Sequence, residues 1–167
     1  MNQTDVIKTI LDEQPIVSHP NHYTSHPSGI ECLEISRYLP FGLGNCIKYL
    51  WRSGIKGGQE KRLEDVSKAL FYLDDALAEW QGIRVNASFM MNMARFLRAM
   101  ASPSINKREE DLLLIRAITA MYQDMECDTV DLNRELKSMR ADLAELVEKM
   151  KKLEVVGGGV VDVYELD

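Results

Sequence analysis

The sequence predicts an all-α protein in which a compact helical domain is followed by a long C-terminal coiled-coil helix and a short tail. Apolar residues recur at spacings of three and four through most of the chain, and prolines and glycines interrupt that spacing at intervals. From residue 115 to residue 153 the apolar spacing continues without a slip for more than five heptads. We therefore divide the chain into an N-terminal helix (1–18), a helical domain (19–82), a Met-rich packing helix (83–103), a coiled-coil oligomerisation helix (104–156) and a tail (157–167).

The overall composition restricts the classes of partner. Hydrophobic residues make up 46% and charged residues 28% of the 167 positions, which is typical of a globular protein. The formal net charge of −6 argues against duplex nucleic acid as a partner. Residues 45–68 depart from this balance, with six cations and three carboxylates, so they favour a small anionic ligand.

Cysteine usage and hydropathy indicate the compartment. The three cysteines are odd in number and form no Cys-x-x-Cys pair, so we expect reduced thiols and a cytoplasmic protein. The first twelve residues are polar and acidic, unlike a signal peptide. No run of about 18 apolar residues exists, so we expect no membrane span.

A loop rich in polar side chains precedes the main helices. Residues 5–13 predict a short amphipathic helix that Pro15 ends, and residues 16–29 are irregular. The polar residues of this loop include His19, Asn21, His22, Tyr23 and His26. Because the histidine spacing fits no zinc pattern, we expect no metal site and instead a loop that closes over a ligand or caps the next helix. Further helices are predicted over 30–39, 60–80 and 85–101.

The stretch between Gly44 and Gly54 carries the densest chemistry of the chain. As a helix it places an apolar face opposite a polar face, and the polar face consists of Asn45, Lys48, Tyr49 and Arg52. The glycine turn that follows returns Lys56 towards this face. Such a row suits a phosphorylated ligand. The alternative is an ordinary solvated face on a core helix.

The helix over 60–80 is expected to lie antiparallel to this one because the connecting loop is short. That arrangement places Lys68 and Tyr72 beside Lys48 and Arg52, and lets Asp65 orient one of the cations. The alternative for Asp65 is a simple ion pair along its own helix.

The heptads from Ile115 to Leu153 predict a continuous helix about 58 Å long. We expect homo-oligomerisation through 115–153, for which a parallel coiled coil is electrostatically allowed. The competing arrangement is a long antiparallel arm that packs on the chain's own domain. Gly157, Gly158 and Gly159 end the helix.

Four motifs in order resemble a small domain family that is common in bacteriophages and largely uncharacterised. They are His19-Pro20-x-His22-Tyr23, Gly29-Ile30-Glu31-Cys32, Gly44-Asn45-x-Ile47-Lys48-Tyr49-x-x-Arg52-x-Gly54-x-Lys56, and Glu64-Asp65-x-x-Lys68-Ala69-x-x-Tyr72-Leu73. The family includes the nucleotide kinase of a T-odd coliphage, which acts on deoxynucleoside monophosphates, lacks a P-loop and forms large homo-oligomers. The resemblance implies a phage protein of the host cytoplasm. Two departures are a different N-terminal region and the heptad arm, for which that kinase offers no equivalent.

The resemblance implies a nucleotide site. Its candidate residues are His19, Asn21, His22, Tyr23, Asn45, Lys48, Tyr49, Arg52, Lys56, Asp65, Lys68 and Tyr72. No P-loop is present, so phosphoryl transfer to a (deoxy)nucleoside monophosphate would rest on the charges of Lys48, Arg52 and Lys68. Asp65 or a loop histidine would orient or deprotonate the acceptor. The donor would be a nucleoside triphosphate with Mg²⁺, although no clear Mg²⁺ cage is visible in the sequence.

Three other functions remain open. The same residues could bind and sequester a nucleotide, including a cyclic nucleotide signal of host defence, without turnover. Glu31-x-x-Glu34 resembles half of the metal motif of all-α nucleoside-triphosphate pyrophosphohydrolases, but the second half has no counterpart at a suitable position. A structural adaptor built on the heptads is the last alternative.

Overall fold

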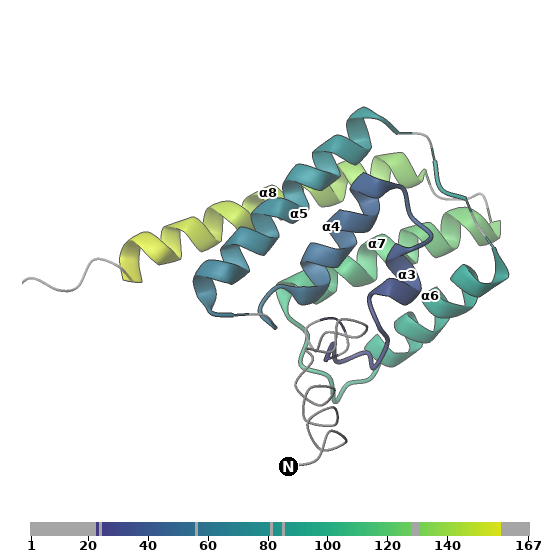
Figure 1. The fold of residues 1–167 in the computed structure, drawn as a ribbon, viewed down its shortest axis with the longest axis horizontal. Coiled ribbons are helices and arrows are strands. Elements are labelled where there is room, and N and C mark those ends of the chain that lie inside the picture. Colours follow the sequence, from purple (N-terminus) through teal and green to yellow (C-terminus); the bar gives the residue numbers. More distant parts are fainter. Residues whose placement is uncertain are drawn as a thin grey trace, which may run out of the picture.

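The structure, a computed structural model, describes residues 23, 25–55, 57–80, 82–84, 86–127 and 131–157. Within these residues it is all-helical and contains no strand (Figure 1). The helices are α3 (Leu33–Ser36), α4 (Phe41–Arg52), α5 (Gln59–Ala78), α6 (Ala87–Met100), α7 (Glu109–Cys127) and α8 (Leu132–Gly157). The helix expected over 5–13 lies outside the described residues, as does the tail after residue 157.

Helices α4 and α5 form the antiparallel pair that the short glycine loop predicts (Figure 1). Gly42 in the first turn of α4 lies against the C-terminal part of α5, where an added Cβ would meet Asp75 Oδ2 at 2.8 Å and the Ala76 backbone nitrogen at 3.0 Å. Only a residue without a side chain allows this approach. The close contact at one end and the loop at the other fix which faces of the two helices meet.

The apolar face of α4 is the centre of the core. Leu43, Cys46, Ile47, Leu50 and Trp51 are fully buried. Trp51 lies against Phe96 of α6, with ring centroids 5.1 Å apart. Helix α3 is shorter than the helix predicted over 30–39, because residues 37–39 form a turn before Pro40.

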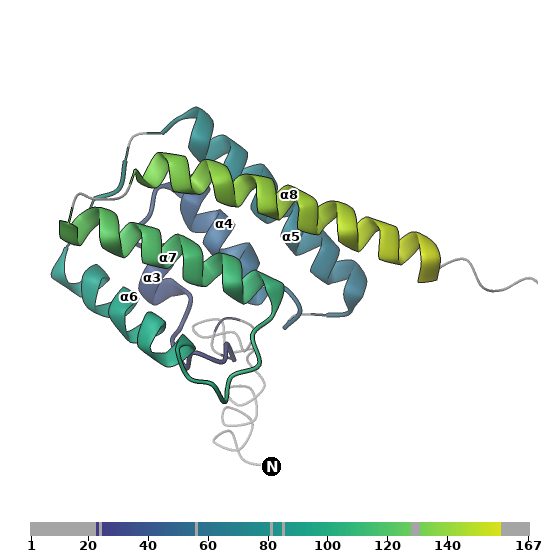
Figure 2. The ribbon, with the colours of Figure 1, turned by 180° about the vertical axis from the view of Figure 1, so that it is seen from behind.

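The single long helix expected over 104–156 is not confirmed. The chain forms α7 and α8 there, and Figure 2 shows them side by side and running in opposite directions. Two ion pairs agree with this direction, since Arg116 meets Asp142 and Glu109 meets Lys149. Helix α8 has its own start, where the Asp131 side chain accepts a hydrogen bond from the Arg134 backbone N–H at 3.0 Å.

The heptad residues are largely buried inside the chain. The buried members of the series are Ile118, Leu132, Leu136, Met139, Leu143, Leu146 and Met150. Helix α8 packs on both α5 and α7, so the apolar seam is explained by packing within one chain, in line with the antiparallel alternative (Figure 2). At its end, α8 leaves Leu153 and Val155 exposed to solvent. Oligomerisation through 115–153 therefore stays a prediction, with most of its expected contact surface already occupied.

None of the described helices combines the length and the apolar character needed to cross a lipid bilayer.

Candidate functional site

An aromatic cluster joins α4 and α5 on the face that the sequence singles out. Tyr49 and Tyr72 stack with their ring centroids 5.5 Å apart and their planes at 9°. Phe41 and Phe71 meet Tyr72 edge-on, at centroid distances of 5.8 and 5.3 Å. Both phenylalanines are largely exposed, at 74% and 66%. We call these four rings the α4–α5 aromatic cluster.

Three cations converge on one ring of this cluster. The Tyr49 ring centroid lies 4.7 Å from Lys48 Nζ, 4.6 Å from the Arg52 guanidinium carbon and 5.7 Å from Lys68 Nζ. The negative face of an aromatic ring attracts cations, so Tyr49 helps to hold three like charges together. The structure thus brings Lys68 and Tyr72 beside Lys48 and Arg52, as the antiparallel arrangement requires.

Arg52 is fixed by Asp65. Arg52 Nε donates to both carboxylate oxygens at 3.1 Å, and Nη2 donates to Oδ1 at 2.6 Å. Partial burial opposes the charge of Arg52, but its hydrogen bonds to Asp65 and Tyr23 outweigh this and raise its pKa. Asp65 is 2% exposed, so its carboxylate is a buried brace that faces Arg52.

Lys48 differs from the other cations of the face. Its Nζ donates to Asn45 Oδ1 at 2.6 Å, and among the described residues it pairs with no carboxylate. Partial burial and the neighbouring charge of Arg52 lower its pKa. A half-buried ammonium without a carboxylate partner is the group of this face best able to take an anionic ligand.

Lys68 is shared with a carboxylate on its own helix. Glu64 forms ion pairs with Lys61 and Lys68, one turn to either side. Hydrogen bonds from these two lysines lower the pKa of Glu64 to about 2. The pairs are solvent-exposed and weak, so a ligand can draw Lys68 away from Glu64 at little cost.

Some candidates cannot be placed on this face. His19, Asn21, His22 and Lys56 lie outside the described residues. Tyr23 is described and its hydrogen bond to Arg52 places it at the face. Sequence reasoning missed Phe41 and Phe71. A signal for Phe71 was available, since Leu70 and Leu73 already supply the apolar seam of that helix and leave Phe71 facing outward.

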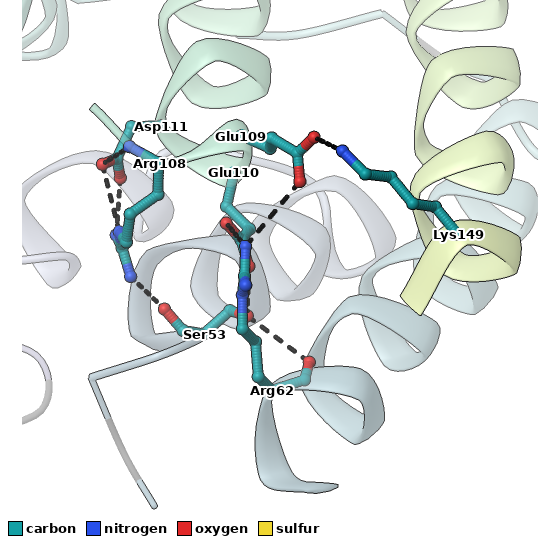
Figure 3. Close-up of polar contacts among 7 residues, drawn as sticks. All are labelled: Ser53, Arg62, Arg108, Glu109, Glu110, Asp111 and Lys149. Atoms are coloured by element: carbon teal, nitrogen blue, oxygen red, sulfur yellow. Dashed lines mark hydrogen bonds and ion pairs between the residues drawn. The ribbon is translucent and has the colours of Figure 1, made fainter. Parts of the chain in front are cut away.

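A second polar cluster, buried, lies where the N-terminus of α7 meets α4 and α5 (Figure 3). Glu110 accepts from Ser53 Oγ at 2.9 Å and from Arg62 Nε at 2.7 Å. Asp111 accepts from Arg108 Nε at 3.0 Å. Both carboxylates are completely buried, so their charges depend on these partners.

His26 belongs to this buried cluster and not to the α4–α5 face. Its ring lies between Trp51 and Phe96, at centroid distances of 4.3 and 5.7 Å. The Ser28 backbone N–H donates to His26 Nδ1, so the ring proton is assigned to Nε2, which donates to Asp111 at 3.2 Å. Although burial opposes the charge of Asp111, hydrogen bonds from His26 and Arg108 hold its pKa well below the usual range.

The Glu34 carboxylate, which belongs to the motif resembling a pyrophosphohydrolase, is bound by an arginine and by its own turn of backbone. Glu34 pairs with Arg95 at 2.8 Å and accepts the backbone N–H of Glu31 at 3.2 Å. In the described part of the chain, no group of three or more histidine, cysteine or acidic side chains is placed to hold a metal ion.

Comparison with known proteins identifies one domain. Residues 17–74 match the model of a family described as a protein of unknown function, DUF3310. The chain therefore contains a DUF3310 domain, which includes α3, α4 and most of α5. Searches of curated proteins and of solved structures found no match. The family description names no activity, so the relation to a phage nucleotide kinase stays a prediction.

Proposed function

We propose that the face formed by α4 and α5 binds a nucleotide. The observation that carries this proposal is the convergence of Lys48, Arg52 and Lys68 on the ring of Tyr49, next to exposed aromatic side chains. Cations beside aromatic rings match the two parts of a nucleotide, since the phosphate needs charge and the base needs a flat apolar surface.

The phosphate is assigned to the cations. Lys48 supplies an ammonium with no carboxylate partner among the described residues, and Lys68 supplies a second whose carboxylate partner, Glu64, is solvent-exposed. Arg52 keeps its place because Asp65 braces it. Lys48 can exchange its hydrogen bond to Asn45 for one to the phosphate. Asn45 stays oriented when this happens, because its amide nitrogen donates to the Phe41 backbone carbonyl.

The base is assigned to the exposed aromatic side chains. One face of Tyr49 is covered by Tyr72, so the surface open to a base is offered mainly by Phe41 and Phe71. Stacking of a base on an aromatic side chain contributes about 1–3 kcal/mol and tolerates different bases. Base preference therefore depends on hydrogen bonds at the rim of this surface.

The reaction we propose is phosphoryl transfer from a nucleoside triphosphate to a (deoxy)nucleoside monophosphate, which yields two diphosphates. Lys48, Arg52 and Lys68 would offset the charge that spreads over the transferred group. Mg²⁺ would accompany the donor. Asp65 is proposed to act through Arg52 as a positioning residue, since both of its oxygens accept from that guanidinium.

Binding without turnover is the second candidate. It is favoured by the same engagement of Asp65, which leaves this carboxylate occupied when an acceptor hydroxyl or phosphate would need it. A protein of this kind would sequester a nucleotide, including a cyclic nucleotide signal.

Product analysis separates the two candidates. The full chain is incubated with each deoxynucleoside monophosphate and a triphosphate donor with Mg²⁺, and diphosphates are measured by ion-exchange chromatography. Diphosphate formation that falls at least about tenfold in Lys48→Gln, and not in the matched surface variant Lys137→Gln, supports transfer. Saturable binding without product supports sequestration. If the protein neither binds a nucleotide nor forms a product, the proposed function is overturned.

A further inference from the structure

A pocket at the N-terminal end of α5 is lined by cations, glycines and two amide side chains. Its cavity of about 440 Å³ is bounded by Gly54, Gly57, Gly58, Gln59, Arg62, Asn106, Lys107 and Arg108. Among the residues that the structure describes, no acidic side chain lines it. We propose that this pocket binds a phosphate group, as a phosphate monoester or a diphosphate, at a site separate from the α4–α5 face.

The lining joins two parts of the chain. The glycines, Gln59 and Arg62 belong to the DUF3310 domain, whereas Asn106, Lys107 and Arg108 lie beyond its end at residue 74. The pocket therefore exists only because the N-terminus of α7 packs beside the loop before α5 (Figure 3). Helix α5 contributes to both sites, but none of the residues assigned to the nucleotide face lines this pocket.

The two arginines are held in place from behind. Glu110 accepts from Nε and Nη2 of Arg62, and Asp111 accepts from Nε of Arg108 (Figure 3). These carboxylates are completely buried, whereas Arg62 and Arg108 retain 24% and 23% side-chain exposure. Guanidinium groups fixed by buried carboxylates lose little freedom when an anion binds to their open side.

Lys107 supplies the charge that no carboxylate offsets within the described part of the chain. Its Nζ donates to the backbone carbonyls of Ser102 at 3.1 Å and Ile105 at 3.5 Å. These bonds hold the ammonium at the loop, and carbonyl oxygens leave its positive charge in place. A cavity with a net positive lining favours an anion.

The glycines keep the floor of the pocket bare. Gly54 and Gly57 adopt φ values of +71° and +80°, which favour glycine. A Cβ on Gly54 would point at Arg108 Nη1, 3.5 Å away, and would shield that guanidinium. Gly58 has an ordinary φ of −85° and open space around its Cα, so it accepts a side chain without strain.

The test follows backbone amides in the ¹⁵N-labelled full chain by NMR. The probes are sodium pyrophosphate and ribose 5-phosphate, each compared with sodium chloride at matched ionic strength. We expect saturable shifts at the amides of Gly54, Gly57, Gly58 and Gln59 with both probes. Shifts confined to the α4–α5 face, or shifts that chloride reproduces, would overturn the proposal.

Gly58→Asp distinguishes binding from folding. Gly58 is the N-cap of α5 and makes no side-chain capping bond, so aspartate there is expected to raise the melting temperature. The same carboxylate brings a negative charge to the pocket rim and should weaken pyrophosphate binding by at least about tenfold. Lys107→Gln should weaken binding several-fold, and Lys137→Gln should leave it unchanged. Full binding by a stabilised Gly58→Asp protein would overturn the proposal.

Discussion

Arg52 and Asp65 form a two-pronged ion pair between the C-terminal end of α4 and the second turn of α5. Three nitrogen–oxygen contacts of 2.6 to 3.1 Å join them, and their side chains are only 15% and 2% exposed. This pair ties the cation cluster to the antiparallel packing of the two helices. The position of Arg52 is therefore set by the fold before any ligand arrives.

Asp65→Asn should damage both the fold and the site. The neutral amide cannot balance the half-buried guanidinium, so we expect a loss of about 1–3 kcal/mol in the free energy of unfolding. Nucleotide affinity should fall several-fold because Arg52 is no longer braced. Urea unfolding and calorimetric titration measure the two effects.

Asp74→Asn is the matched control for that variant. Asp74 lies on the same helix and pairs with Arg140, but both side chains are about half exposed. Exposed pairs contribute less than about 1 kcal/mol, so this variant should unfold and bind almost as the parent protein does. Equal losses in both variants would contradict the role assigned to Asp65.

Nucleotide affinity should decline as the pH rises, and the decline should begin at a lower pH than it would if the phosphate were bound by a lysine of ordinary pKa. Burial and Arg52 lower the pKa of Lys48, so its ammonium loses a proton below the usual value of about 10.4. Titrations between pH 7 and pH 10 test this. Lys48→Arg should extend binding to higher pH, and Lys48→Gln should remove the dependence. A flat profile for the parent protein would exclude Lys48 as a phosphate ligand.

Glu110→Gln should destabilise the protein by about 2–4 kcal/mol at pH 7, since it leaves the partly buried Arg62 with only its longer, 3.9 Å contact to Glu109. Burial opposes the charge of Glu110, yet hydrogen bonds from Arg62 and Ser53 keep its pKa lowered. Because the pKa of Glu110 is lower in the folded state, its carboxylate stabilises the fold at pH values above its pKa in the unfolded state, about 4.3. This stabilisation is lost as the pH falls through the pKa of the folded state. The difference in the free energy of unfolding between the parent protein and Glu110→Gln should therefore become smaller at acidic pH.

Urea unfolding at pH 7, 5 and 3 checks this pH dependence. Glu109→Gln is the neighbouring control, because Glu109 is 45% exposed, pairs with Lys149 on the surface and reaches Arg62 only at 3.9 Å. It should change the unfolding free energy by less than about 1 kcal/mol. If the loss of unfolding free energy in Glu110→Gln grew larger at acidic pH, it would contradict an ionised Glu110 in the folded protein.

Much of the α4–α5 face was predictable because it depends on local information. Helical spacing sorted Asn45, Lys48, Tyr49 and Arg52 onto one side of α4, and a short loop required α5 to return alongside. Those two constraints were enough to bring Tyr72 onto Tyr49.

The remaining structure depends on contacts that spacing does not specify. A heptad seam is equally satisfied by a second copy or by another part of the same chain, so it did not reveal that α8 folds back on α7 and α5. The bond between His26 and Asp111 joins residues 85 positions apart, which no local pattern encodes. Three acids at 109–111 are typical of the first turn of a helix, and α7 does begin there, but Glu110 and Asp111 also bind the distant residues Arg62 and His26.

Leu143→Ala should test whether the heptad seam works within one chain. Leu143 is completely buried, so its truncation should cost about 2–5 kcal/mol. Since the seam packs against α5 and α7, the melting temperature of the parent and of the variant should not depend on protein concentration. Calorimetry over a hundredfold concentration range measures this. A melting temperature that rises with concentration in the parent, and less so in the variant, would show that the seam joins subunits.

We propose that the cations around Tyr49 bind a nucleotide. Isothermal titration calorimetry of Lys48→Gln against Lys137→Gln, each with the nucleotide that binds the parent protein most tightly, tests it most directly. Both variants remove one lysine charge, and only the first removes it from the face. We predict that Lys48→Gln loses at least about tenfold in affinity with an unchanged melting temperature, while Lys137→Gln binds as the parent does. Equal affinity in the two variants would contradict the account.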